Sequence, residues 1–122
     1  PLPITGDGSE TRDWTYVGDI VNGLLAMGVK DKAIGQAINL GSGKEHKVVD
    51  MARMVNELAG NEAGIKFVER RDWDVKKRLC SSIGRAQNVL DYQPTVSFED
   101  GLRSVHSWFA NNWSEIQRSA EF

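Results

Sequence analysis

One segment of fourteen residues, from Gly6 to Asp19, restricts the possible folds of this 122-residue chain more than any other. Two glycines, Gly6 and Gly8, predict a tight turn, and the aromatic and β-branched residues of 12–17 predict a strand after it. Asp19 then suits the N-cap of a helix. Arg12 is therefore expected between a turn and a strand, where a planar guanidinium can bind a phosphate through two hydrogen bonds.

The rest of the chain alternates between strand and helix patterns, with no repeat and no low-complexity linker. Apolar residues recur at helical spacing in the predicted helices, and Ser97 with Asp100 matches a capping box. This order of elements predicts an α/β fold. We expect strands at 2–5, 12–17, 37–40 and 65–68, and helices at 19–28, 48–59, from Ser82 to before Pro94, and at 97–116.

Composition and charge exclude several classes of function. The chain is long enough for one domain and too short for two. A net charge of −2 argues against non-specific nucleic-acid binding, which needs a basic face. Cys80 is the only cysteine, so an internal disulfide and a cysteine-based zinc site are excluded, and we expect no bound metal. No apolar segment suits a signal peptide or a membrane span, so we expect no membrane partner and a cytoplasmic location.

Two later segments complete a pattern. Residues 37–43 read Ala-Ile-Asn-Leu-Gly-Ser-Gly, and residues 71–74 read Arg-Asp-Trp-Asp, followed by Asp-Tyr-Gln-Pro at 91–94. Together with the Arg-Asp-aromatic-x-Tyr-Val motif that begins at Arg12, they resemble the C-terminal third of an extended short-chain dehydrogenase/reductase. The nucleotide-sugar epimerases and dehydratases, such as UDP-glucose 4-epimerase, are the most similar members, and the resemblance covers about residues 2–108.

The resemblance implies an α/β C-terminal substrate-binding part that lacks the N-terminal dinucleotide-binding sheet. The sequence contains neither a Gly-x-x-Gly-x-x-Gly motif after a strand nor a Tyr-x-x-x-Lys pair. We therefore expect residues 1–122 to form a single nucleotide-sugar-binding domain that binds no cofactor alone and is inactive alone. NAD is implied for the complete enzyme.

The resemblance also assigns substrate-binding residues. In the family, the arginine at the position of Arg12 contacts the diphosphate of the nucleotide-sugar. The Arg-x-x-Asp element gives Arg71 to the diphosphate and Asp74 to the ribose hydroxyls. These roles suit the chemistry, because a diphosphate binds guanidinium groups and a diol binds a carboxylate. The structural alternatives are an Arg12 paired with a neighbouring aspartate or lying along an aromatic ring, and a surface ion pair between Arg71 and Asp74.

The resemblance also bears on three other segments. Leu2, Pro3 and Ile4 match the extended segment beside the nucleotide base, and the alternative is an N-terminal strand. The glycines of 41–43 are expected to serve a turn rather than a phosphate. The spacing from Asp74 to Ser82 is one residue longer than is usual in the family, so whether Arg78 faces the ligand stays open.

The predicted function is therefore binding of a nucleotide-sugar, with a UDP-sugar preferred and an epimerase as the expected complete enzyme. A 4,6-dehydratase or a decarboxylase would use the same contacts. The alternative from another class is a non-catalytic interaction module that docks onto a partner chain. We also expect self-association or domain swapping, because the helix at 20–27 and the strand at 37–40 would expose an apolar face and an unpaired strand edge.

Overall fold

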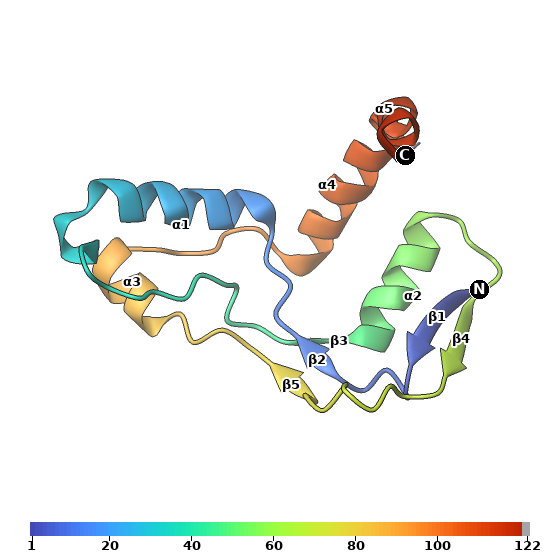
Figure 1. Cartoon of the computed structure of the whole chain (residues 1–122). Helices are drawn as coiled ribbons and strands as arrows, with labels where there is room; N and C mark the ends of the chain where they lie inside the picture. Colours follow the sequence, from blue (N-terminus) through green and yellow to red (C-terminus); the bar gives the residue numbers. More distant parts are fainter. Residues whose placement is uncertain (121–122) are drawn as a thin grey trace.

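The structure, a computed structural model, describes residues 1–120 as an α/β arrangement with two small sheets (Figure 1). The α/β class predicted from the sequence is confirmed. The strands are β1 (Leu2–Thr5), β2 (Thr11–Arg12), β3 (His46–Lys47), β4 (Ile65–Val68) and β5 (Arg78–Leu79). The helices are α1 (Val17–Val29), a 3-10 turn (Asp31–Ala33), α2 (Val48–Leu58), α3 (Gly84–Leu90), α4 (Phe98–Asn111) and α5 (Trp113–Ala120).

Both sheets join the beginning of the chain to distant segments. β1 pairs in parallel with β4, with Leu2 opposite Ile65 and Thr5 opposite Val68. β2 is the central strand of the second sheet, antiparallel to β3 and parallel to β5. Arg12 consequently lies at the centre of three strands that come from separate parts of the sequence.

The buried cluster of the chain lies between α1, α3 and the segment that precedes β3. It consists of Ala33, Ala86, Leu90 and Tyr92, with Ile38 and Leu40 packed against it. The Tyr92 hydroxyl donates a hydrogen bond to the Gly41 carbonyl at 3.0 Å. A tyrosine that is both buried and hydrogen-bonded contributes apolar area while its polar end stays satisfied.

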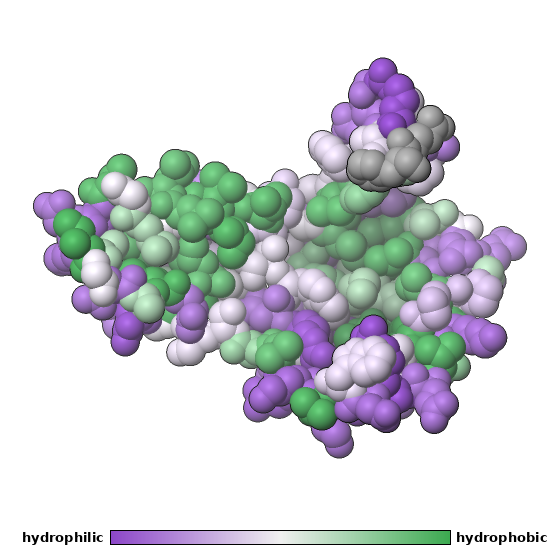
Figure 2. Space-filling view, in the orientation of Figure 1, coloured by the Kyte–Doolittle hydropathy of each residue, from purple (hydrophilic) through white to green (hydrophobic). Residues whose placement is uncertain are grey.

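One face of α1 is apolar and open to solvent. Its large side chains are between 46% and 81% exposed, and Figure 2 shows a continuous hydrophobic surface over this helix. These residues are Val17, Val21, Leu24, Leu25 and Val29. No helix within residues 1–120 combines the length and the apolar character needed to cross a membrane.

Two of the predicted strands are wrong. The strand expected at 12–17 ends after Arg12, because β3 and β5 are only two residues long. Beyond it, the Asp13 N–H still donates to the Leu79 carbonyl at 2.9 Å. Residues 37–40 form no strand, since no described segment pairs with them. Instead a side chain binds their backbone: Arg85 donates to the Ala37 carbonyl at 2.9 Å.

The helix predictions are closer, with differences at the ends. α1 begins at Val17 with Tyr16 as N-cap, so the prediction of Asp19 as the cap is wrong. The buried Asp19 carboxylate instead accepts hydrogen bonds from the backbone of Thr95 and Val96 at 3.0 and 3.2 Å. α3 begins at Gly84 with Ile83, not Ser82, as its N-cap, and it ends before Pro94 as predicted.

The last predicted helix is two helices. The capping box is confirmed at its start, where the Ser97 hydroxyl accepts a hydrogen bond from the backbone N–H of Asp100 at 3.1 Å. The helix breaks at Asn112, whose side-chain amide donates to the Trp108 carbonyl at 2.8 Å. Asparagine commonly ends a helix in this way, since its side chain competes for backbone groups.

Candidate functional site

A polar cavity of about 210 Å³ brings together three of the residues that the sequence analysis singled out: Arg12, Arg71 and Asp74. Its other lining residues are Thr5, Glu10 and Val48. β1 and β2 supply one wall, the start of α2 a second, and the turn at 71–74 a third. Residues that are nearly seventy positions apart in the sequence therefore lie in one site, because strand pairing in the two sheets brings their segments together.

Arg12 has no acidic partner within residues 1–120. Its guanidinium donates hydrogen bonds to the carbonyls of Thr11 at 2.7 Å and Lys76 at 3.1 Å. The pairing with Asp13 or Asp19 that was considered as an alternative is not present. The cation that the sequence assigned to a phosphate is thus bound only to neutral groups.

Arg71 and Asp74 form a bidentate ion pair. Arg71 Nε lies 2.8 Å from Asp74 Oδ2, and Nη2 lies 3.2 Å from Oδ1. The hydrogen bonds from Arg71 lower the pKa of Asp74, and the same bonds raise the pKa of Arg71. The Arg71 guanidinium also lies 5.7 Å from the centre of the Trp73 ring. These contacts match the ion-pair alternative for Arg71 and Asp74.

Glu10 and Arg70 are site residues that the sequence analysis missed. The Glu10 carboxylate is buried and lies 3.1 Å from Arg70 Nη1, while Arg70 Nε donates to the Asp74 carbonyl at 2.8 Å. Arg70 thus connects the segment before β2 to the 71–74 turn. The sequence did contain a signal for Glu10. It lies two residues before Arg12, and side chains at that spacing lie on the same face of an extended chain.

Asp13 accepts hydrogen bonds from two distant segments beside the site. Its Oδ1 accepts from Ser42 N at 2.9 Å, and its Oδ2 accepts from Gly43 N at 3.0 Å and Ser81 N at 3.1 Å. Partial burial raises the pKa of Asp13, but the hydrogen bonds from Ser42, Ser81 and Gly43 outweigh it and keep this pKa below its ordinary value. The glycine loop at 41–43 therefore binds a protein carboxylate.

The remaining predicted residues lie outside the cavity. Leu2, Pro3 and Ile4 form β1, and the Ile4 side chain is buried. Arg78 is exposed and pairs with Glu45, which also accepts a hydrogen bond from Thr11 at 2.7 Å. The hydrogen bonds from Arg78 and Thr11 lower the pKa of Glu45 to about 2.

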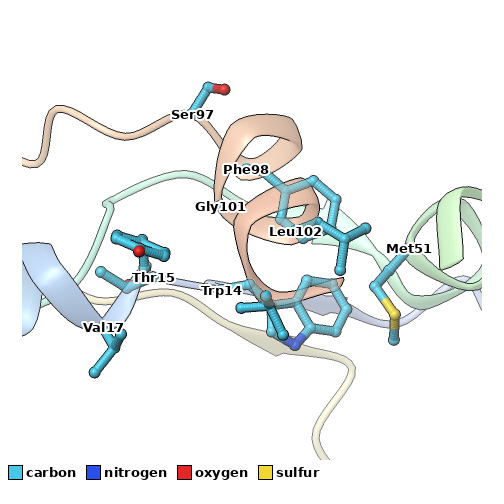
Figure 3. A pocket seen from close by; sticks show the side chains of 10 residues that line it. Trp14, Thr15, Val17, Met51, Ser97, Phe98, Gly101 and Leu102 are labelled. Atoms are coloured by element: carbon cyan, nitrogen blue, oxygen red, sulfur yellow. The ribbon is translucent and has the colours of Figure 1, made fainter. Parts of the chain in front are cut away.

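A second, larger hollow is apolar. It has a volume of about 330 Å³ and lies between α4, Met51 of α2 and the segment that leads into α1 (Figure 3). Trp14, Phe98 and Leu102 line it, with the Trp14 and Phe98 rings 5.6 Å apart. None of its lining residues is charged, so it offers no side-chain cation to a diphosphate, whereas the polar cavity offers Arg12 and Arg71.

Comparisons with known proteins agree with this architecture. The family model described as GDP-mannose 4,6 dehydratase matches residues 1–105. A UDP-glucuronic acid decarboxylase 1 from Xenopus tropicalis is 33% identical over 108 residues, which are 88% of this chain and 25% of the relative.

Two solved structures are similar over most of the chain. An epimerase from Methanothermobacter thermautotrophicus has a TM-score of 0.95 and 63% identity, covering all of this chain and 36% of its own. UDP-glucuronic acid 4-epimerase from Bacillus cereus, in complex with UDP-glucuronic acid and NAD, has a TM-score of 0.81 and 33% identity, covering 91% of this chain and 35% of its own. The chain therefore spans between a quarter and about a third of the length of these three proteins.

Proposed function

Because the chain belongs to the GDP-mannose 4,6-dehydratase family of NAD-dependent epimerases and dehydratases, we propose that it binds the nucleotide-sugar, a UDP-sugar, in such an enzyme. The proposal takes residues 1–122 as a single C-terminal substrate-binding domain. The observation that supports this proposal most directly is the cavity that Arg12, Arg71 and Asp74 share. Relatives that are named for UDP-sugars support the choice of ligand.

Each of the three residues has a role that suits its chemistry. Arg12, bound only to carbonyls, donates to the diphosphate, and Arg71 donates to it from the 71–74 turn. Asp74 accepts hydrogen bonds from the ribose diol. Leu2, Pro3 and Ile4 stay in the proposal as the backbone beside the base, at the far end of β1 from the cavity. These contacts orient the substrate and do not transfer protons or hydride.

The described residues do not fit a dinucleotide. Binding of NAD by this fold class uses a glycine-rich turn between a strand and the start of a helix. The helices that follow strands in residues 1–120 are α1, α2 and α3, and their N-caps are Tyr16, Lys47 and Ile83. We therefore assign no NAD contact to this chain, expect no activity from it alone, and propose NAD for the complete enzyme.

Titration of the chain with UDP tests the proposed site. Arg12→Ala and Arg71→Ala are each expected to weaken binding about tenfold or more, the effect of losing a hydrogen bond to a charged group. Isothermal titration calorimetry gives the dissociation constants. Arg103→Ala, which removes an exposed arginine from α4, is the control and should leave binding unchanged. Equal affinity in all four proteins would refute the assignment.

The proposal also covers the type of reaction that the complete enzyme catalyses. An epimerase is preferred, in line with the two similar epimerase structures, while a dehydratase or decarboxylase would use the same substrate contacts. The cytoplasmic location also stays a prediction.

The exposed apolar face of α1 favours a second candidate role, docking onto a partner chain or onto another copy of this chain. The face consists of five large side chains, and contiguous apolar surfaces of this kind usually mark an interface. The strand edge once expected at 37–40 gives no support, because those residues form no strand. Self-association or domain swapping through α1 is proposed on this ground alone.

Light scattering across a range of concentrations tests self-association. The chain is expected to show a mass that rises with concentration, and Leu25→Glu should restore the monomer mass, because it places a charge in the apolar face. Asn22→Glu adds the same charge at an exposed polar position of α1 and should leave association intact. A concentration-independent monomer in the unmodified chain would rule the proposal out.

A further inference from the structure

The turn at 71–74, which lies along one wall of the polar cavity, is connected to the strands by an ion pair outside the turn. We propose that Glu10 and Arg70 are positioning residues, which hold this turn in place and do not themselves bind the ligand. The inference rests on the proposed function, since it concerns how that same site is formed. It depends on what attaches the turn to the rest of the chain.

Side-chain packing does not hold the turn. The large apolar residues in and beside it, Trp73 and Val75, are 74% and 73% exposed. The backbone hydrogen bonds are local, because the Asp74 N–H donates to the Arg71 carbonyl at 3.0 Å and the Val75 N–H to the Trp73 carbonyl at 2.9 Å. The ion pair between Arg71 and Asp74 also lies within the turn. These contacts shape the turn but do not attach it to the strands.

Two polar side chains connect the turn to the strands, within the part of the chain that the structure describes. The Thr5 hydroxyl lies 3.5 Å from Asp74 Oδ2, a long distance for a hydrogen bond. Arg70 makes shorter contacts, since its Nε donates to the Asp74 carbonyl at 2.8 Å and its Nη1 lies 3.1 Å from Glu10 Oε1. The next attachments come after the turn, where the carbonyls of 76–77 accept hydrogen bonds from β2. One guanidinium therefore connects the backbone of the turn to the residue before β2.

Burial of the carboxylate makes this connection strong. The Glu10 side chain is 9% exposed, and Arg70 is its one ion-pair partner among residues 1–120. Breaking the pair would leave a carboxylate without a charged partner in a place that water barely reaches, which is costly. The pair therefore stays formed and keeps the turn at the cavity. A turn that is already in place lowers the ordering cost that a ligand would otherwise meet.

Electrostatics alone predicts the opposite role for Glu10. Its carboxylate lines the same cavity as Arg12 and Arg71, so its charge repels a diphosphate, and removing that charge would tighten binding. Glu10→Gln keeps the size of the side chain and removes the charge. If Glu10 is a positioning residue, this variant should bind UDP about three- to tenfold more weakly, because the turn must then be ordered on binding. Isothermal titration calorimetry gives the dissociation constants.

Arg70→Ala removes the other half of the pair and is also expected to weaken UDP binding. The double variant Glu10→Gln, Arg70→Ala should bind no more weakly than Arg70→Ala, because the two residues act through one contact. Arg53→Ala is the matched control. The Arg53 guanidinium also lies 3.1 Å from a carboxylate, that of Asp50, but both side chains are exposed on α2. This variant should leave UDP binding unchanged.

Hydrogen exchange separates a loosened turn from a loss of overall stability. In Glu10→Gln the amides of Asp74 and Val75 should exchange faster, whereas those of α3 should not change. Unchanged exchange in the turn, equally faster exchange in α3, or UDP binding as tight as in the unmodified chain would overturn the inference. The proposed function would stand in each case if Arg12→Ala still weakens UDP binding. Absence of UDP binding to the unmodified chain would overturn both.

Discussion

The Asp13→Ala chain is expected to lose about 3 kcal/mol or more of its free energy of unfolding, since Asp13 accepts charge-assisted hydrogen bonds from several donors. The donors are Thr15 Oγ1, Ser42 N, Ser42 Oγ, Gly43 N and Ser81 N. Alanine would leave three backbone N–H groups without an acceptor and disconnect the 41–43 loop from β2. Thermal unfolding followed by circular dichroism should show a midpoint lower by about 10 °C or more.

Asp13→Asn separates the role of the charge from that of the shape. Because the pKa of Asp13 is below its ordinary value of 3.8 in the folded chain, ionised Asp13 stabilises the fold above that pH, and this stability is lost as the pH falls through the folded pKa. The decline in the free energy of unfolding below about pH 4 should therefore be shallower in Asp13→Asn than in the unmodified chain. Parallel pH profiles, or an unfolding midpoint of Asp13→Ala equal to that of the unmodified chain, would contradict this account.

Gly41→Ala is expected to destabilise the chain by about 2 to 3 kcal/mol through overpacking. A Cβ at this position would lie 2.4 Å from Ser81 Cβ, 2.5 Å from Ser81 Oγ and 2.8 Å from Asp13 Oδ2. The Cβ of Ser81 cannot move without its backbone, which itself donates to Asp13. The substitution therefore separates two segments that the aspartate holds together, and chemical denaturation should give a lower midpoint with an unchanged slope.

Gly84→Ala is the control for this change. It adds the same methyl group at the first residue of α3, where no atom lies within 4 Å of the added carbon. Alanine favours helix over glycine, so this variant should be as stable as the unmodified chain or slightly more stable. If both glycine variants lost the same stability, close approach at Gly41 would not be the cause.

The sequence predicted most of the helices and β4, because their apolar spacing and caps are local signals. It did not predict where β2 ends, since that depends on how long β3 and β5 are, and these two-residue strands have no pattern of their own. Residues 37–40 show the same difficulty. An apolar run is equally compatible with a buried strand and with a loop whose Ile38 and Leu40 cover a core.

For the site, the structure brings Arg12, Arg71 and Asp74 to one cavity, a meeting that no local pattern indicates, and their binding roles stay predictions. The ion pair between Arg71 and Asp74 was among the alternatives, but the other partners of the site residues were not predicted. Arg70 pairs with Glu10 and donates to the Asp74 carbonyl, and no motif of the sequence singled out either Arg70 or Glu10. Such pairings depend on the register between distant strands, which the sequence of one segment does not contain.

The same register has a consequence for how the chain acquires its structure. Within the described residues, β1 and β2 precede all the strands that pair with them, and Asp13 accepts a hydrogen bond from Ser81, 68 residues later. During synthesis from the N-terminus, the early strands stay without their final partners until β4, β5 and Ser81 have emerged. Contacts of such separation slow folding, because a long loop must close before any of them forms. α1 is complete before β4 and β5 are synthesised, so its apolar face is present before either sheet has all of its strands.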